Sequence, residues 1–213
     1  MRWFTSDLHL FHNLVYKKYR SKYAASIQEM HEDLIVRWNK QVKHKDIVYV
    51  LGDVTFGKWE ESKEIISRLN GRKILIRGNH DDRFTSAQWI ELGFEDVRDI
   101  LVIKKSGDFP VAKRWILCHY PYSSSIRYFF YRWFGKFFKQ RSEASYYKLF
   151  PSYKDHKLVH GHHHDGPIYK HDQLNVAWDV HGRLLDENDI LYLFEAYGRQ
   201  NTILSKIKTI LWL

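Results

Sequence analysis

The chain has 213 residues, a length that fits one domain with a sizeable core. Its 34 Lys and Arg exceed its 25 Asp and Glu, and the net charge of +9 suits polyanions or anionic membranes as partners, or simply a solvated basic surface. The single cysteine excludes an internal disulfide, and neither a secretory leader nor an apolar run of roughly 18 residues is visible, so we expect a cytoplasmic protein.

Five short apolar runs have the length and the β-branched or aromatic composition of strands. In chain order they cover Trp3–Ser6, Ile47–Leu51, Ile74–Ile76, Trp115–Cys118 and Leu158–Val159.

Helical patterns fill the gaps between these runs. Ser26 and Glu29 have the spacing of a capping box and are followed by apolar residues at helical spacing up to Val42, which predicts a helix there. Further helices are predicted over Trp59–Leu69 and Ser86–Leu92. This alternation of strands and helices predicts a layered α/β domain.

Each predicted strand is followed by polar side chains that can hold a metal ion. They are Asp7 and His9, then Asp53, then Asn79, then His119, and finally His162 and His164. Ligand sites of open α/β sheets lie beyond the carboxyl ends of the strands, so these groups are expected to meet in one cleft.

The donor atoms of this set are oxygen and nitrogen, without thiolate, which suits Mn, Fe, Zn or Co. Seven ligands exceed what one four- or five-coordinate ion needs, but they suit two ions that share a carboxylate. Two ions about 3.5–4 Å apart clamp the attacking and leaving oxygens of a displacement and make hydroxide available near neutral pH. The paired residues of Asp7-x-His9 and His162-x-His164 should face one side of an extended backbone, with His163 facing away and Cys118 opposite to His119.

These blocks, read in order, resemble the calcineurin-like metallophosphoesterases, whose pattern is D-x-H, G-D, G-N-H-D/E, H and G-H-x-H. The resemblance covers residues 7–164. It implies an αββα sandwich of two mixed β-sheets flanked by helices. It also implies a first metal at Asp7, His9 and His164, a second at Asn79, His119 and His162, and Asp53 bridging both. Manganese is the expected ion.

Within the family, the opening Phe4-Thr5-Ser6-Asp7-Leu8-His9-Leu10-Phe11-His12 is similar to small bacterial and phage members. The resemblance makes His80 the group that stabilises the transition state or protonates the leaving oxygen, a role that suits the neutral-range pKa of histidine. Asn79, His80 and His12 are expected to contact the substrate phosphate, although His12 also fits a surface histidine after a strand.

Other polar residues have plainer interpretations. His160 is expected in the core or beside the ligands, Asp179 in a late strand, and Arg83 in solvent rather than on phosphate. The remaining unmatched histidines are expected to be surface or structural residues: His31, His44, His156, His171 and His181.

Two segments depart from small family members. An insertion at about 122–150 carries aromatic residues at helical spacing with Arg and Lys beside them, which predicts a basic amphipathic helix that serves as a lid, a membrane contact or part of the core. Residues 202–213 form a second amphipathic segment, expected to dock on the domain, with a membrane foot or a dimer contact as alternatives.

The function expected from these features is hydrolysis of phosphomonoesters or phosphodiesters by a two-metal-activated hydroxide. A pyrophosphohydrolase of a lipid-linked nucleotide is an alternative that depends on the aromatic insertion. A nuclease is another, because basic and aromatic residues together bind nucleic acid strands. A non-catalytic scaffold on the same fold is the distant alternative, since such proteins usually lose ligand histidines and this chain keeps them.

Overall fold

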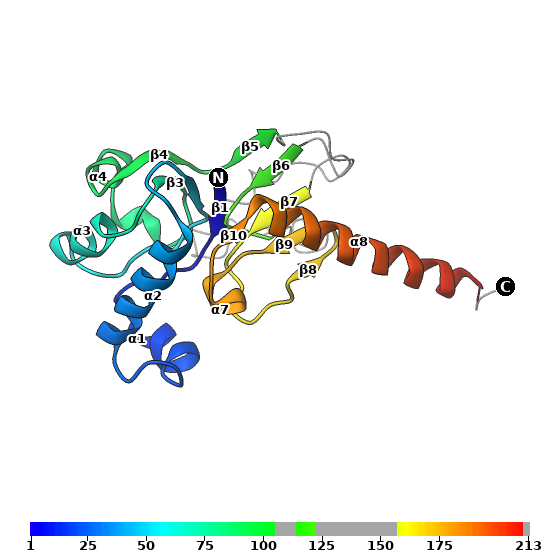
Figure 1. Cartoon of the computed structure of the whole chain (residues 1–213), viewed down its shortest axis with the longest axis horizontal. Helices are drawn as coiled ribbons and strands as arrows, with labels where there is room; N and C mark the ends of the chain where they lie inside the picture. The colour runs from blue at the N-terminus through cyan, green and yellow to red at the C-terminus, as the bar shows by residue number, and fades with distance from the viewer. Residues whose placement is uncertain (105–113, 122–156, 211–213) are drawn as a thin grey trace, which may run out of the picture.

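The computed structural model describes residues 1–104, 114–121 and 157–210, and within them the chain forms two five-stranded mixed sheets (Figure 1). In spatial order the first sheet contains β10 (Leu185–Asp186), β1 (Arg2–Thr5), β2 (Ile47–Val50), β3 (Arg72–Ile76) and β4 (Phe94–Arg98). The second contains β5 (Leu101–Lys104), β6 (Arg114–Leu117), β7 (Lys157–His160), β9 (Gln173–Asn175) and β8 (Tyr169–Lys170).

The five predicted strands are β1, β2, β3, β6 and β7, with ends that differ by one or two residues. Within each sheet these strands run parallel, and their register aligns their carboxyl ends. Thr5 lies opposite Val50, and Val50 lies opposite Leu75. In the second sheet Leu117 lies opposite Val159. The segments that carry the candidate ligands therefore leave each sheet at one level.

Four of the other five strands have sequences that do not show the apolar pattern of a buried strand; the fifth, β5, reads Leu-Val-Ile-Lys and was not predicted although it is apolar. Strand β4 reads Phe-Glu-Asp-Val-Arg and is the outermost strand of its sheet, so a neighbouring strand pairs with only one of its two edges. Strands β8 and β10 have only two residues each. Strand β9 is fully buried although two of its three residues, Gln173 and Asn175, are polar.

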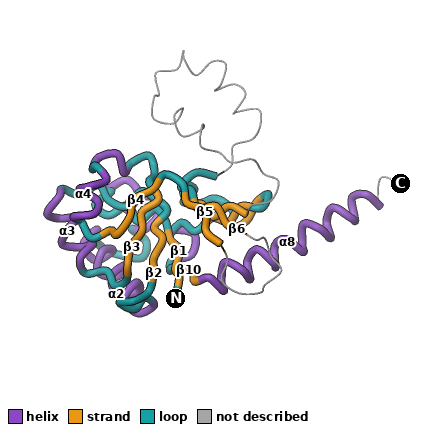
Figure 2. The backbone as a smooth tube through the Cα atoms, turned by 90° about the horizontal axis from the view of Figure 1, so that it is seen from above, coloured by secondary structure: helices purple, strands orange, loops and turns teal. Residues whose placement is uncertain are grey.

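Helices α2 (Ile27–Gln41), α3 (Trp59–Ser67) and α4 (Ser86–Glu91) cover the outer face of the first sheet (Figure 2). Side chains alternate along a strand, so Val48 and Val50 of β2 pack on these helices. Helix α2 begins as predicted: the Ser26 hydroxyl accepts from the Glu29 amide, but the Glu29 carboxylate bonds to the amide of Ala25 rather than closing the box on Ser26.

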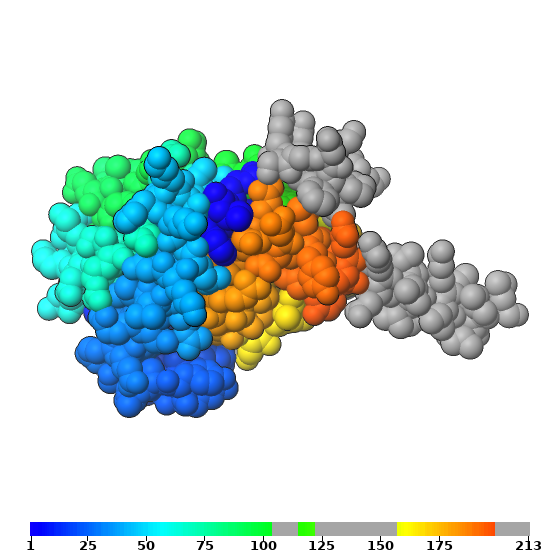
Figure 3. Space-filling view, viewed as in Figure 1, coloured from blue at the N-terminus to red at the C-terminus, as the bar shows by residue number. Residues whose placement is uncertain are grey.

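A second core lies between the two sheets. It receives Tyr49 from the other face of β2 and Leu51 directly after that strand, together with Phe4 of β1 and Trp115 of β6. Helix α8 (Glu187–Ile210) adds apolar side chains from its first two turns, including Phe194. The predicted sandwich of two mixed sheets flanked by helices is confirmed, and Figure 3 shows the N-terminal residues in contact with the C-terminal part of the fold.

The structure corrects one predicted element, and two other predictions fall outside the described residues. Asp179 belongs to helix α7 (Trp178–His181), not to a strand, because the chain turns at Ala177 to form a short helix that ends at Gly182. The insertion at 122–150 lies outside the described residues, as do the side chains of 202–213, although the backbone of α8 reaches Ile210. No helix in the described part of the chain is both long and apolar enough to cross a membrane.

Candidate metal centre

The candidate ligands lie on backbone that turns sharply after each strand. Asp7, His9, Asp53 and His162 have positive φ angles of 58°, 44°, 56° and 70°. Such conformations cost about 1–3 kcal/mol each in non-glycine residues and cluster at functional sites. The prediction that Asp7 with His9, and His162 with His164, lie on extended backbone is therefore wrong. The chain leaves the extended conformation at the residue that carries the ligand, so spacing alone does not decide which side chains pair.

The side chains converge into two clusters whose possible ligand atoms lie within 4.8 Å of one another. Asp7, His9 and His164 form the first cluster. Asp53, His119 and His162 form the second. His162 and His164 thus belong to different clusters, as the family resemblance implies, while the intervening His163 is exposed.

Asp53 lies between the two clusters. Its Oδ2 atom is 3.5 Å from Nε2 of His9 and 3.5 Å from Nε2 of His119. Its other oxygen, Oδ1, accepts the backbone N–H of His80 at 3.0 Å. One carboxylate oxygen therefore lies equally close to an imidazole of each cluster.

Hydrogen bonds orient two of the imidazoles. The Nδ1 atom of His119 lies 2.7 Å from the carbonyl oxygen of Leu51, and that of His164 lies 2.6 Å from Oδ2 of Asp179. Each acceptor requires a proton on Nδ1, so Nε2 carries the lone pair and faces the cluster. The Nε2 atoms of His164 and His9 are 3.1 Å apart, as are His119 Nε2 and His162 Nδ1.

The residues fit a pair of transition-metal ions. Asp7 Oδ1 and Asn79 Oδ1 are buried and form no hydrogen bond with the described residues. Buried polar atoms usually have partners, so unpartnered oxygens beside converging imidazole nitrogens indicate places for cations. Asn79 follows β3 and is only partly buried as a residue.

Burial and mutual charge shift the pKa values of these groups. Burial raises the pKa of Asp53 to about 7, against the opposite effect of the neighbouring His119. Burial lowers the pKa of His9 to about 4 and that of His162 to about 3, so both stay neutral above pH 5. Burial alone would raise the pKa of Asp7. The neighbouring imidazoles, His9 above all, lower it by more than burial raises it, so the pKa lies below its usual range.

The glycines of the motifs allow a close approach of backbone to ligand. A Cβ atom on Gly161 would lie 1.8 Å from Ser6 Oγ and 2.5 Å from Asp7 Oδ2. A Cβ on Gly78 would lie 2.3 Å from Asp53 Oδ1. Both positions therefore exclude every other residue unless the ligand carboxylates move.

Asp81 organises the backbone under the second cluster. Its carboxylate is fully buried and accepts the N–H groups of Asp53, Val54 and Gly78 at 2.8, 3.0 and 2.7 Å. Asp81 is the last residue of the G-N-H-D/E motif, and the sequence pattern gave it no role. Its position directly after Asn79 and His80 was the available signal.

Arg20 and Asp179 were missed as parts of the site. The guanidinium of Arg20 donates to both oxygens of Asp179 and to the carbonyls of Leu8 and Asp7. Asp179 in turn orients His164. Arg20 does not directly follow a predicted strand and belongs to no motif, so the sequence offers no signal for it.

The side chain of His80 is 44% exposed and lies with its Nε2 4.0 Å from Asp53 Oδ2. The ring of Phe56 packs 3.9 Å from the ring centroid of His12 and 4.8 Å from that of His80. These three rings form one rim of the centre. Burial lowers the pKa of His80 below its ordinary value of 6.5.

The remaining singled-out residues have structural or surface positions. His31 is buried and accepts the N–H of Phe11, His160 is buried beside the carbonyl of Gly161, and His181 bonds to the carbonyl of Asn175. Arg83 is exposed and donates to the Thr55 carbonyl. Cys118 is buried in a small apolar cluster with Ile116, Tyr120 and Leu158. His44 and His171 are exposed, and His156 lies outside the described residues.

A family model described as calcineurin-like phosphoesterase matches residues 2–196. The chain belongs to this family. Membership agrees with the order of the motifs and with the two clusters of metal-ligand type.

Relatives of the chain occur in an archaeon and in a phage. An uncharacterized protein of Methanocaldococcus jannaschii is 42% identical over 79 residues, which is 36% of this chain and less than half (44%) of that relative. The gene 66 protein of Mycobacterium phage L5 is 25% identical over 204 residues, covering 88% of this chain and 91% of the phage protein. The crystal structure of a protein of unknown function from Aquifex aeolicus matches with a TM-score of 0.60 and 25% identity, over 91% of this chain and 98% of that one.

Proposed function

We propose that the chain is a metal-dependent phosphoesterase that hydrolyses phosphomonoester or phosphodiester bonds with two divalent transition-metal ions. The observation that carries the proposal is the position of Asp53, whose Oδ2 is equally distant from a histidine of each cluster. Asp7, His9 and His164 would hold one ion, and Asn79, His119 and His162 the other. Manganese is the first candidate, with iron, zinc or cobalt as alternatives.

Bound ions would supply the positive charge that activates water and stabilises the phosphoryl oxygens. His80 and His12 project from the rim at which a phosphate would enter. In the reaction the water oxygen bonds to phosphorus, the P–O ester bond breaks, and the leaving oxygen takes a proton. His80 is the donor that we infer for this proton, because a phosphate bound beside it favours the imidazolium form against the effect of burial.

The test is a titration of the purified, chelator-treated protein with manganese, followed by calorimetry and by hydrolysis of nitrophenyl phosphate and bis-nitrophenyl phosphate. We expect two bound ions per chain and activity that appears only with metal. The Asp53→Asn variant should bind fewer ions and lose nearly all activity. Hydrolysis that continues in the chelator-treated protein, or a single bound ion at full activity, would contradict the proposal.

The alternatives rest on different parts of the chain. The lipid-linked nucleotide pyrophosphohydrolase depends on residues 122–150, which lie outside the described residues, and remains a hypothesis, as do contact with an anionic membrane and a cytoplasmic location. Complete inactivity with every ester and metal, at full metal occupancy, would favour the non-catalytic scaffold. The nuclease hypothesis gains support from one specific cavity, described next.

A further inference from the structure

A cavity of about 770 Å³ opens beside the metal centre, on the side of His164. Its walls are the turn of π-helix η1 (Tyr16–Arg20) with the residues that follow it, one face of α2, the loop after His164, and α7. Apolar side chains line part of it, namely Met30, Ile168, Trp178 and Val180. The candidate metal ligand His164 is itself part of the wall, so a molecule in the cavity would lie next to the metal centre.

Two lysine–tyrosine pairs, four residues apart, line this cavity. The ammonium group of Lys18 lies 4.7 Å from the ring centroid of Tyr19, and that of Lys22 lies 4.7 Å from the ring centroid of Tyr23. The Tyr19 ring stacks on the His164 ring, with centroids 5.0 Å apart and planes 9° apart. Tyr23 is 75% exposed, so its ring is accessible to a ligand.

The charges of the cavity favour an anionic ligand. Arg20 is neutralised by Asp179, and Arg37 by Asp33. Lys18 and Lys22 form no ion pair with a described residue, and Asp165 is the carboxylate that remains to oppose them on this wall. Two exposed ammonium groups therefore alternate with two aromatic rings along one short segment.

We propose that this cavity binds a single strand of nucleic acid and leads one of its phosphodiesters to the metal centre. Lys18 and Lys22 would contact successive phosphates, and a base would stack on Tyr23, which is how sequence-tolerant single-strand sites are built. A flat membrane surface fits less well, because the apolar side chains line a concave space instead of a projecting face. The inference rests on the proposed phosphoesterase function and specifies the substrate class of that site.

The test measures binding of the manganese-loaded protein to a fluorescein-labelled phosphorothioate oligothymidylate of about 12 nucleotides, a length within the usual site sizes. The phosphorothioate retains the charge and resists cleavage. Replacing Lys18 and Lys22 with Gln should lower the slope of log Kd against log salt by about 1.4, or about 0.7 for each lost phosphate contact. Tyr23→Ala should weaken binding roughly 5- to 150-fold through the lost stacking.

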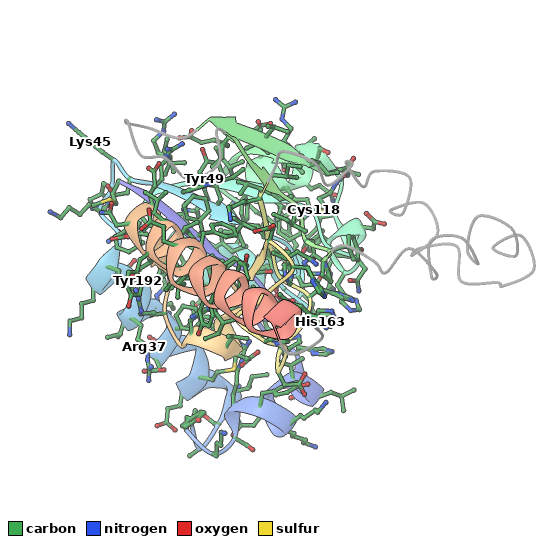
Figure 4. The ribbon with its side chains drawn as sticks, turned by 90° about the vertical axis from the view of Figure 1, so that its right-hand side faces the viewer. Arg37, Lys45, Tyr49, Cys118, His163 and Tyr192 are labelled. Atoms are coloured by element: carbon green, nitrogen blue, oxygen red, sulfur yellow. The ribbon has the colours of Figure 1, made fainter. Side chains whose placement is uncertain are left out.

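The matched control removes the same charge elsewhere. Lys17 and Lys45 are exposed, neither lines the cavity, and Lys45 lies far from Arg37 of the cavity wall (Figure 4). Replacing both with Gln should leave the salt slope within about 0.3 of the unmodified protein. Equal losses of slope in the two double variants would overturn the proposal. So would absent binding of the oligonucleotide together with binding to phosphatidylglycerol vesicles.

A second readout separates this inference from the proposed function. Turnover of bis-nitrophenyl phosphate at saturating manganese should be unchanged in the Lys18→Gln/Lys22→Gln variant, because this small diester does not reach the lysines. If the unmodified protein hydrolyses the diester but binds the oligonucleotide no better than the double variant does, the cavity proposal fails and the phosphoesterase stands. If oligonucleotide binding depends on salt, on Lys18 and Lys22 and on Tyr23 as expected, but no metal-dependent hydrolysis occurs, the cavity proposal stands and the proposed phosphoesterase function fails.

Discussion

Replacing Arg20 with Met should destabilise the protein strongly, because this side chain neutralises a buried carboxylate next to the metal centre. Arg20 and Asp179 are only 5% and 6% exposed, and their closest contact is 2.7 Å. The same guanidinium donates to the carbonyls of Leu8 and Asp7 at 2.6 and 2.8 Å. The variant would leave one charge and two backbone acceptors buried without these partners.

Breaking a buried ion pair by removing one member costs about 3–5 kcal/mol. For a chain of this length each kcal/mol lowers the melting temperature by roughly 2–4 °C, so the expected decrease is roughly 6–20 °C. The measurement is thermal and urea unfolding in the presence of a chelator. Manganese affinity should also fall about 10- to 100-fold, because Asp179 no longer holds His164 in place.

The control is Arg37→Met, which removes an ion pair with Asp33 on the exposed face of α2. Both of its side chains are about half exposed, at 51% and 48%, and such pairs contribute about 0–1 kcal/mol. The double variant Arg20→Met/Asp179→Asn should recover part of the lost stability, since the unpaired carboxylate is gone. If the free energies of unfolding of Arg20→Met and Arg37→Met differ by less than about 1 kcal/mol, the Arg20–Asp179 pair does not have the stabilising role that we assign to it.

Three further predictions address the metal centre and the insertion. In the metal-free protein the pKa of Asp53 is raised from 3.8 to about 7, so between these pH values the folded chain keeps a proton that the unfolded chain has lost. The contribution of Asp53 to the free energy of unfolding therefore falls by up to about 1.4 kcal/mol per pH unit as pH rises between these values. Asp53→Asn should for this reason raise the melting temperature of the metal-free protein at pH 7. A lower melting temperature in the variant would contradict the raised pKa. His80→Ala should keep both metals and slow hydrolysis about 10²–10⁴-fold, less with a nitrophenolate leaving group, and loss of one metal equivalent would show that His80 is a ligand. Replacing Trp133 and Phe134 with serine should impair turnover of a lipid-linked substrate more than that of a small ester at unchanged metal content, whereas equal losses with a lower melting temperature would make the insertion part of the core.

The strands that carry the candidate ligands were predictable because each of them combines a continuous apolar run with a polar ligand-type residue in the turn that follows. Val48 and Val50 face the helices while Tyr49 and Leu51 face the other sheet, so β2 is apolar on both faces and reads as a continuous run. The turn that follows it contains Gly52 and Asp53. An edge strand such as β4 needs only one apolar face. Its charged residues interrupt the apolar run, so the sequence pattern did not predict it as a strand.

The sequence by itself determined the kinds of donor atoms and their places at strand ends, since parallel strands of one sheet bring their carboxyl ends to one edge. Only the tertiary structure decided how the donors divide into two clusters. His162 and His164 are two residues apart but belong to different clusters, because the backbone at His162 is left-handed. Arg20 and Asp179 are 159 residues apart and meet behind His164. Such contacts depend on how helices and loops pack in three dimensions, and a local pattern of apolar and polar residues does not encode that packing.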